Sequence, residues 1–80
     1  MPFLTDHREY FFMQISITVN GKKLEISEGT DVKTLVEQQG FSVVYVAVER
    51  NGEIVPKNSY SETVLMPEDV IEIVQFVGGG

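Results

Sequence analysis

Gly78, Gly79 and Gly80 are the residues of this 80-residue sequence whose type and spacing point most directly to chemistry. Glycine makes up about 7% of average protein sequence, so three in a row are rare by chance, although glycine-rich ends are often plain linkers. Beyond Val77, three extended residues span about 10 Å, and a segment without side chains can thread a narrow channel. We therefore predict a flexible tail over residues 78–80 that presents the α-carboxylate of Gly80.

A carboxylate undergoes acyl transfer only after one of its oxygens becomes a good leaving group, for example by adenylation. The rest of the sequence does not supply that chemistry. His7 is the only histidine and there is no cysteine, which excludes a Cys/His dyad and disfavours a Ser/His/Asp triad. For Glu68, Asp69 and Glu72 a solvated turn is favoured over a metal site. The sequence has no glycine-rich loop followed by lysine, so it does not predict a P-loop for ATP. We expect no catalytic residue, no metal and no bound cofactor.

The composition indicates one small globular domain, with 42% hydrophobic and 22% charged residues. Its net charge of −6 disfavours nucleic acid and anionic membranes as partners, because both attract basic surfaces. No apolar run approaches the roughly 18 residues of a membrane span, and the N-terminus lacks the pattern of a secretory signal. We expect a cytoplasmic protein that binds neither nucleic acid nor membrane.

The elements that position the tail can be read from the hydrophobic pattern. Apolar and polar residues alternate over 14–19, Asn20-Gly21 is a strong hairpin signal, and the alternation resumes behind it. A helix is expected from about residue 31 to 39, with Thr30 as N-cap and Gly40 as the residue that closes it. Its apolar stripe consists of three residues at helical spacing: Val32, Leu35 and Val36.

The second half of the sequence is rich in strand-forming residues. A buried strand is expected over 43–49, followed by a turn at Asn51-Gly52, and a short strand over 63–66 before a turn at 67–69. Residues 70–77 are apolar on both faces, which is typical of a central strand.

The resulting β-β-α-β-β-β order predicts an α+β fold of the β-grasp (ubiquitin-like) type. Such a fold has a mixed sheet of four to five strands and one main helix, with the C-terminal strand central and parallel to the first. The domain is expected over 13–77. Residues 1–12 are either a non-native or poorly ordered extension or an aromatic docking arm, and 78–80 form the tail.

The last strand also predicts a docking surface. Val70, Val74 and Phe76 share one face, and we expect that face to meet a partner because Glu72 lies among them and would be costly in a core. Val77, at the root of the tail, is added to this docking set. The alternative that Phe76 belongs to the core remains open.

The hairpin "VNGK", the strand "VAVERNGEIVP" and the ending "DVIEIVQFVGGG" resemble the ThiS family, the ubiquitin-like sulfur carriers of thiazole synthesis in the thiamine pathway. The resemblance covers about residues 13–80. It implies that an E1-like adenylyltransferase (ThiF-like) uses ATP to adenylate Gly80, which then becomes a thiocarboxylate. The sulfur would come from a donor such as a cysteine desulfurase system and pass to thiazole synthase (ThiG-like). Gly78 and Gly79 would form the flexible neck.

Three other functions share this fold and tail. The chain could be the MoaD-like small subunit of molybdopterin synthase, a ubiquitin-like modifier of lysines, or a β-grasp interaction module whose tail is idle. The resemblance of "NGEIVP" and "QFVGGG" favours the thiamine branch over the molybdopterin branch.

Overall fold

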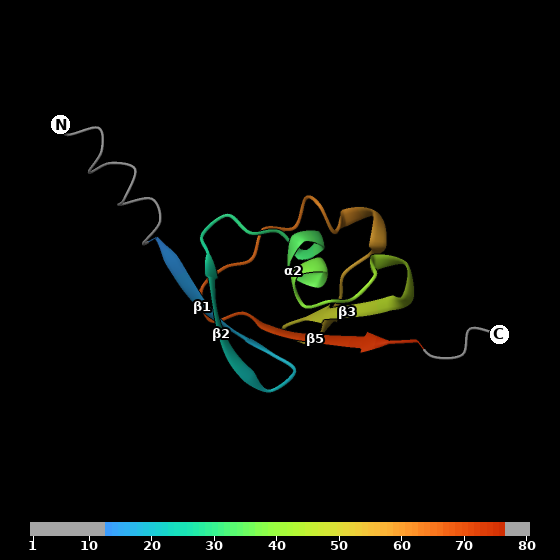
Figure 1. Cartoon of the computed structure of the whole chain (residues 1–80), viewed down its shortest axis with the longest axis horizontal. Helices are drawn as coiled ribbons and strands as arrows, with labels where there is room; N and C mark the ends of the chain where they lie inside the picture. The colour runs from blue at the N-terminus through green and yellow to red at the C-terminus, as the bar shows by residue number, and fades with distance from the viewer. Residues whose placement is uncertain (1–12, 77–80) are drawn as a thin grey trace.

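A five-stranded mixed sheet carries one α-helix on one face in the computed structural model, which describes residues 13–76 (Figure 1). The predictions for residues 1–12, for Val77 and for the tail 78–80 lie outside the described residues. The elements follow in chain order: β1 (Gln14–Val19), β2 (Lys22–Ser27), α2 (Val32–Gln38), the 3-10 turn η1 (Val43–Tyr45), β3 (Val46–Arg50), β4 (Glu53–Ile54), the 3-10 turn η2 (Lys57–Ser59) and β5 (Val70–Gln75).

The β1–β2 hairpin confirms the first prediction from the sequence. The two strands pair antiparallel, with Ile17 opposite Leu24. Asn20 and Gly21 have φ values of 50° and 84°, so both turn residues lie in the left-handed region. Asparagine and glycine are the residues that adopt this conformation most readily, which explains the short turn.

The helix α2 forms where expected, but its N-cap is Asp31 and not Thr30. A carboxylate oxygen of Asp31 accepts a 2.7 Å hydrogen bond from the backbone N–H of Thr34, and hydrogen bonding to Thr34 lowers the pKa of Asp31. The prediction of Thr30 was wrong because its hydroxyl donates to the carbonyl of Ser27 at 2.7 Å. Gly40 follows the helix with φ 88°, as expected for a residue that closes it.

The sheet order is β2-β1-β5-β3-β4, so β5 is central, as predicted. It runs parallel to β1 and antiparallel to β3 (Figure 1). The five strands and single helix confirm the β-grasp prediction within the described part of the chain. Since α2 has seven residues, no helix in residues 13–76 is long and apolar enough to cross a membrane.

Three predicted strands differ from those in the structure. The strand predicted over 43–49 begins only at Val46, because residues 43–45 form η1 where the chain crosses from the helix to the sheet. The stretch 63–66 is not a strand, since it makes only a single bridge between Val64 and Asp31. β5 ends at Gln75, two residues earlier than predicted.

The core lies between α2 and one face of the sheet. Helix residues Val32, Leu35 and Val36 have no exposed surface, and they pack against the inward side chains of the strands. From β5 these include Ile71, which is fully buried, and Ile73, which is 5% exposed. Alternation along β5 therefore directs every second side chain into the core and the others away from the helix.

Candidate functional site

β5 and the residue that follows it carry three of the apolar side chains predicted to dock a partner. Val70, Val74 and Phe76 are 44%, 56% and 54% exposed. They lie on the sheet face opposite α2, because the intervening Ile71 and Ile73 fill the core. Phe76 is therefore not a core residue. Their role in binding a partner remains a prediction.

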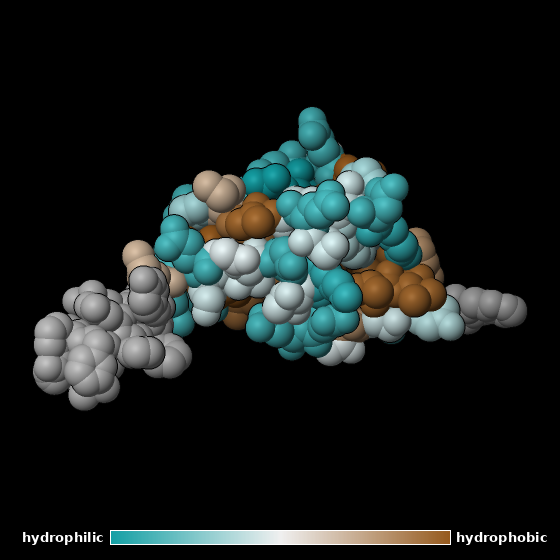
Figure 2. All heavy atoms as spheres, turned by 90° about the horizontal axis from the view of Figure 1, so that it is seen from above, coloured by the Kyte–Doolittle hydropathy of each residue, from teal (hydrophilic) through white to brown (hydrophobic). Residues whose placement is uncertain are grey.

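Two further apolar residues lie next to Phe76, in the 3-10 turn η1 that directly precedes β3. Val44 is 63% exposed and Tyr45 is 56% exposed, and the Tyr45 carbonyl accepts a 2.7 Å hydrogen bond from the N–H of Phe76. We refer to Val44, Tyr45, Val74 and Phe76 as the docking cluster. Figure 2 shows hydrophobic side chains gathered at the end of the molecule where β5 finishes. Val44 and Tyr45 were not predicted as surface residues, because the sequence pattern over 43–49 is typical of a regular buried strand.

Lys57 fixes one side of the docking cluster. Its ammonium group lies 5.8 Å from the centre of the Phe76 ring and donates a 3.1 Å hydrogen bond to the carbonyl of Val44. An ammonium group at this distance is attracted to the face of an aromatic ring. The contact joins η2, which follows β4, to η1 and to the residue that follows β5.

The asparagine of the first hairpin turn holds the central part of β5. The Asn20 side-chain carbonyl accepts from the N–H of Ile73 at 2.7 Å, and its amide donates to the carbonyl of Ile73 at 3.2 Å. The backbone N–H of Asn20 also donates to the carbonyl of Ile71. Regular pairing of β1 with β5 stops at Val19. The Asn20 side chain therefore supplies the hydrogen bonds to Ile73 that the backbone of a further β1 residue would make.

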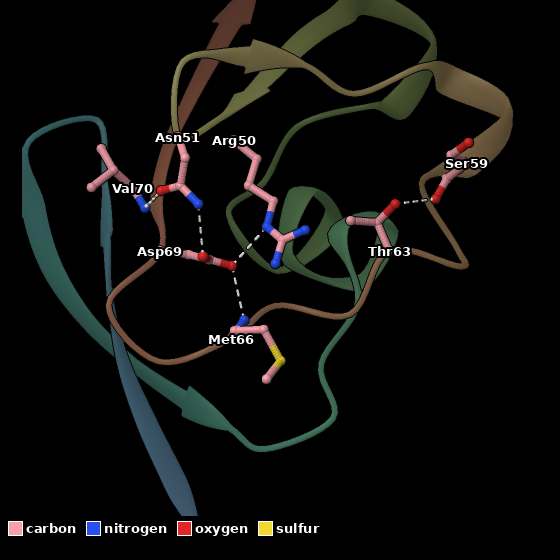
Figure 3. Close-up of polar contacts among 7 residues, drawn as sticks. All are labelled: Arg50, Asn51, Ser59, Thr63, Met66, Asp69 and Val70. Carbon is pink, nitrogen blue, oxygen red and sulfur yellow. Dashed lines mark hydrogen bonds and ion pairs between the residues drawn. The ribbon is translucent and has the colours of Figure 1, made fainter.

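The start of β5 is held by a polar network around Asp69 (Figure 3). One carboxylate oxygen accepts from Arg50 Nε and from the N–H of Met66, both at 2.8 Å, and the other accepts from Asn51 Nδ2 at 2.9 Å. Asn51 in turn accepts from the N–H of Val70 at 2.8 Å. The network therefore connects the second Asn-Gly turn to the first residue of β5.

Asp69 is only 5% exposed, so the expectation that it lies in a solvated turn was wrong. Burial raises the pKa of Asp69, but the hydrogen bonds from Met66, Asn51 and Arg50, together with the positive charge of Arg50, outweigh it and hold the pKa below its usual range. The residue is thus ionised and fully engaged in positioning β5. Nothing within residues 13–76 gathers three potential metal ligands.

The strand β5 is fixed along its length and ends among exposed apolar side chains. A central strand, held by β1, β3 and two asparagine side chains, leads to an end surrounded by exposed apolar residues. Together the fold and this surface define a ubiquitin-like protein of the β-grasp class.

The comparisons with known proteins identify the family. The model of the ThiS family matches residues 10–80, and the chain belongs to this family. The sulfur carrier protein ThiS of Bacillus subtilis is 42% identical over 65 residues, which are 80% of this chain and 98% of that protein. The crystal structure of a thiamine biosynthesis protein (ThiS) from Geobacter metallireducens superposes with a TM-score of 0.70 at 32% identity, and the match covers 82% of this chain and all of that one. The resemblance noted from the sequence is therefore confirmed.

Longer proteins also contain a related segment. The thiazole synthase of Paramagnetospirillum magneticum is 41% identical over 66 residues, and that of Magnetococcus marinus is 39% identical over 66 residues. In each case the match covers 82% of this chain but only 20% of the relative, so the chain spans about a fifth of the length of these thiazole synthases.

Proposed function

We propose that this protein is a sulfur carrier of thiamine biosynthesis and that the carboxylate of Gly80 is the group that carries the sulfur. The family match through residue 80, which includes the three terminal glycines, is the observation that carries this proposal. The near-complete coverage of the Bacillus subtilis sulfur carrier supports it.

The chemistry takes place in partner enzymes. In an E1-like adenylyltransferase of the ThiF type, the Gly80 carboxylate attacks the α-phosphorus of ATP, forming an acyl adenylate and releasing pyrophosphate. Sulfur at the oxidation level of sulfide then displaces AMP with loss of one proton, which leaves a thiocarboxylate. A donor such as a cysteine desulfurase system supplies this sulfur as a persulfide, and a thiol reductant provides the two electrons that bring it to the sulfide level. Since activation consumes ATP, we place the carrier in the cytoplasm.

Gly78 and Gly79 act as the neck that enters the partner. Without side chains they fit a narrow channel and adopt whichever backbone angles it requires. Val70, Val74, Phe76 and Val77 contact the partner surface around the channel entrance. The exposure of the first three supports this role, as does their position on the strand that leads to the neck.

Thiazole synthase is the proposed acceptor of the sulfur. Two relatives named thiazole synthase include a segment similar to this chain, and each whole protein is about five times as long as that segment. In those proteins the carrier-like segment is covalently joined to the remainder. Such a connection supports a working relationship between this carrier and a ThiG-like enzyme.

The intact mass of the protein tests the proposal. The full chain is incubated with ATP, sulfide and a purified ThiF-type enzyme that modifies a known carrier in parallel. We expect a mass gain equal to exchange of one oxygen for sulfur, localised to Gly80 and absent after deletion of that residue. An unchanged mass, while the known carrier is modified, would overturn the proposal. Conjugates to lysine that depend on Gly80 would indicate a protein modifier instead.

The docking role has a separate test with a matched pair of variants. Val74→Ser removes an apolar side chain from the docking cluster. Val64→Ser makes the same change at a 45% exposed position outside this cluster, in the loop where Val64 forms a single β-bridge with Asp31. We expect the first variant to raise the carrier concentration needed for half-maximal modification by about fivefold or more, and the second to leave it nearly unchanged. Equal effects of both variants would contradict the assignment.

A further inference from the structure

Two glutamates face each other on the sheet surface that α2 leaves uncovered. The register of β3 and β5 places Glu49 directly opposite Glu72. On either side of them, Asn51 donates to the Val70 carbonyl and Phe76 donates to the Tyr45 carbonyl. This pattern makes Glu49 and Glu72 a hydrogen-bonded pair of an antiparallel ladder, with Cα atoms about 5.5 Å apart and both side chains on one face.

The pair is surrounded by apolar side chains on the same face. Ile54 of β4 lies opposite Glu49 on its other side and is 65% exposed. Val70 and Val74 precede and follow Glu72 at the two-residue spacing that keeps them on its face, and they are also exposed. We refer to Glu49 and Glu72 with this apolar rim as the acidic seat.

The pairing of Glu49 with Glu72 does not stabilise the isolated domain. Like charges directly opposite one another destabilise a sheet, and within residues 13–76 the only ion pair joins Arg50 to Asp69. The described part of the chain therefore provides no cation for Glu49 or Glu72. Two carboxylates held side by side on this face, Glu72 exposed and Glu49 half-buried, match a guanidinium group, whose fork of donors can bind both.

We propose that the acidic seat receives an arginine side chain of the activating enzyme, with the apolar rim packing around it. This inference rests on the proposed function and names the chemistry of its docking surface. An enzyme that binds ATP next to the tail must gather basic groups to hold the polyphosphate, so a basic docking surface continues what its own chemistry requires. The net charge of the carrier, −6, favours the same encounter.

A double substitution tests the acidic seat. Glu49→Gln with Glu72→Gln keeps size and polarity but removes both charges. The control is Glu37→Gln with Glu62→Gln, which removes two charges from exposed positions on α2 and in the loop after η2. Thiocarboxylate formation by the ThiF-type enzyme is followed by intact mass at increasing carrier concentration, at low and high salt.

We expect the seat variant to raise KM by about tenfold, with kcat unchanged and a weaker dependence of KM on salt. The control should change KM by less than about twofold. In urea titrations the seat variant should be at least as stable as the wild type, since it loses a repulsion. The single variant Glu72→Gln provides an independent, smaller shift in KM.

An unchanged KM, or the same KM shift in the control, would overturn the acidic seat. Failure of the proposed function looks different, because the wild-type protein itself would then gain no mass at any concentration. A fall in kcat with unchanged KM would also contradict a docking role.

Discussion

Asp69→Asn provides the sharpest test of how the start of β5 is held. The carboxylate accepts three hydrogen bonds, and an asparagine has only one oxygen to replace two. If that oxygen keeps the bonds from Arg50 and Met66, the new NH₂ group faces the donating NH₂ group of Asn51. Asn51 cannot reverse its amide without penalty, because its oxygen already accepts from Val70.

The expected loss follows from these contacts. A hydrogen bond to a charged group contributes about 1.5–3 kcal/mol and a neutral one about 1 kcal/mol, while a buried donor left without an acceptor costs about 1–3 kcal/mol. Weakening two bonds and replacing the third by two opposed donors gives a loss of about 3 kcal/mol. Since the free energy of unfolding of a native protein is roughly 5–15 kcal/mol, a loss of this size should be plainly measurable.

Urea titration of the wild type and Asp69→Asn from pH 7 to pH 3 measures this effect. The folded-state pKa of Asp69 lies below its ordinary value, so its stabilisation is present above the unfolded-state pKa of about 3.9 and disappears as the pH falls through the folded-state value. The variant lacks this term. The stability difference should be constant above about pH 5 and shrink below about pH 4.

Glu68→Gln is the matched control, because it neutralises the exposed neighbour of Asp69 in the same turn. It should change the free energy of unfolding by less than about 0.5 kcal/mol. A loss below about 1 kcal/mol for Asp69→Asn at pH 7, or a difference that does not shrink at low pH, would refute the role given to the carboxylate.

Three further substitutions test other parts of the fold. Asn20→Gly preserves the left-handed turn but removes both side-chain hydrogen bonds to Ile73. We expect the free energy of unfolding to fall by about 1–2 kcal/mol and the Ile73 amide to exchange its hydrogen faster. Unchanged exchange at Ile73 would contradict the role of Asn20 in place of a strand residue. Gly40→Ala meets no atom within 4 Å, so thermal unfolding should show only the conformational cost of φ 88°, about 1–2 kcal/mol, and an unchanged midpoint would contradict this. Leu35→Ala should cost about 2–5 kcal/mol in urea titration because the side chain is fully buried, and a smaller loss would mean that the core refills the space.

The sequence was sufficient to predict the features set by local pattern. Alternation along β5 predicted that Val74 and Phe76 lie on the face opposite Ile71 and Ile73, and their exposure confirms this. Likewise, Asn20-Gly21 predicted the turn, because few residues adopt left-handed backbone angles readily.

The features that were missed depend on contacts between distant residues. Asp69 looked like part of a solvated turn because its donors Arg50 and Asn51 lie 19 and 18 positions earlier in the chain. The pairing of Glu49 with Glu72 depends in the same way on the register between two strands. The β-branched residues Val43 and Val44 favoured a strand, yet the change of layer there required a 3-10 turn.

The position of β5 in the sheet has a mechanical consequence. In the proposed function, an enzyme that binds the chain beyond Phe76 pulls along the axis of β5. This strand lies between β1 and β3, and the Asn20 side chain holds it through two hydrogen bonds to Ile73. Ladder hydrogen bonds with the antiparallel neighbour β3 run across the strand, so such a pull loads them together in shear and does not break them one after another. In the proposed function, the sheet therefore resists the force that the partner enzyme applies to the end of the chain.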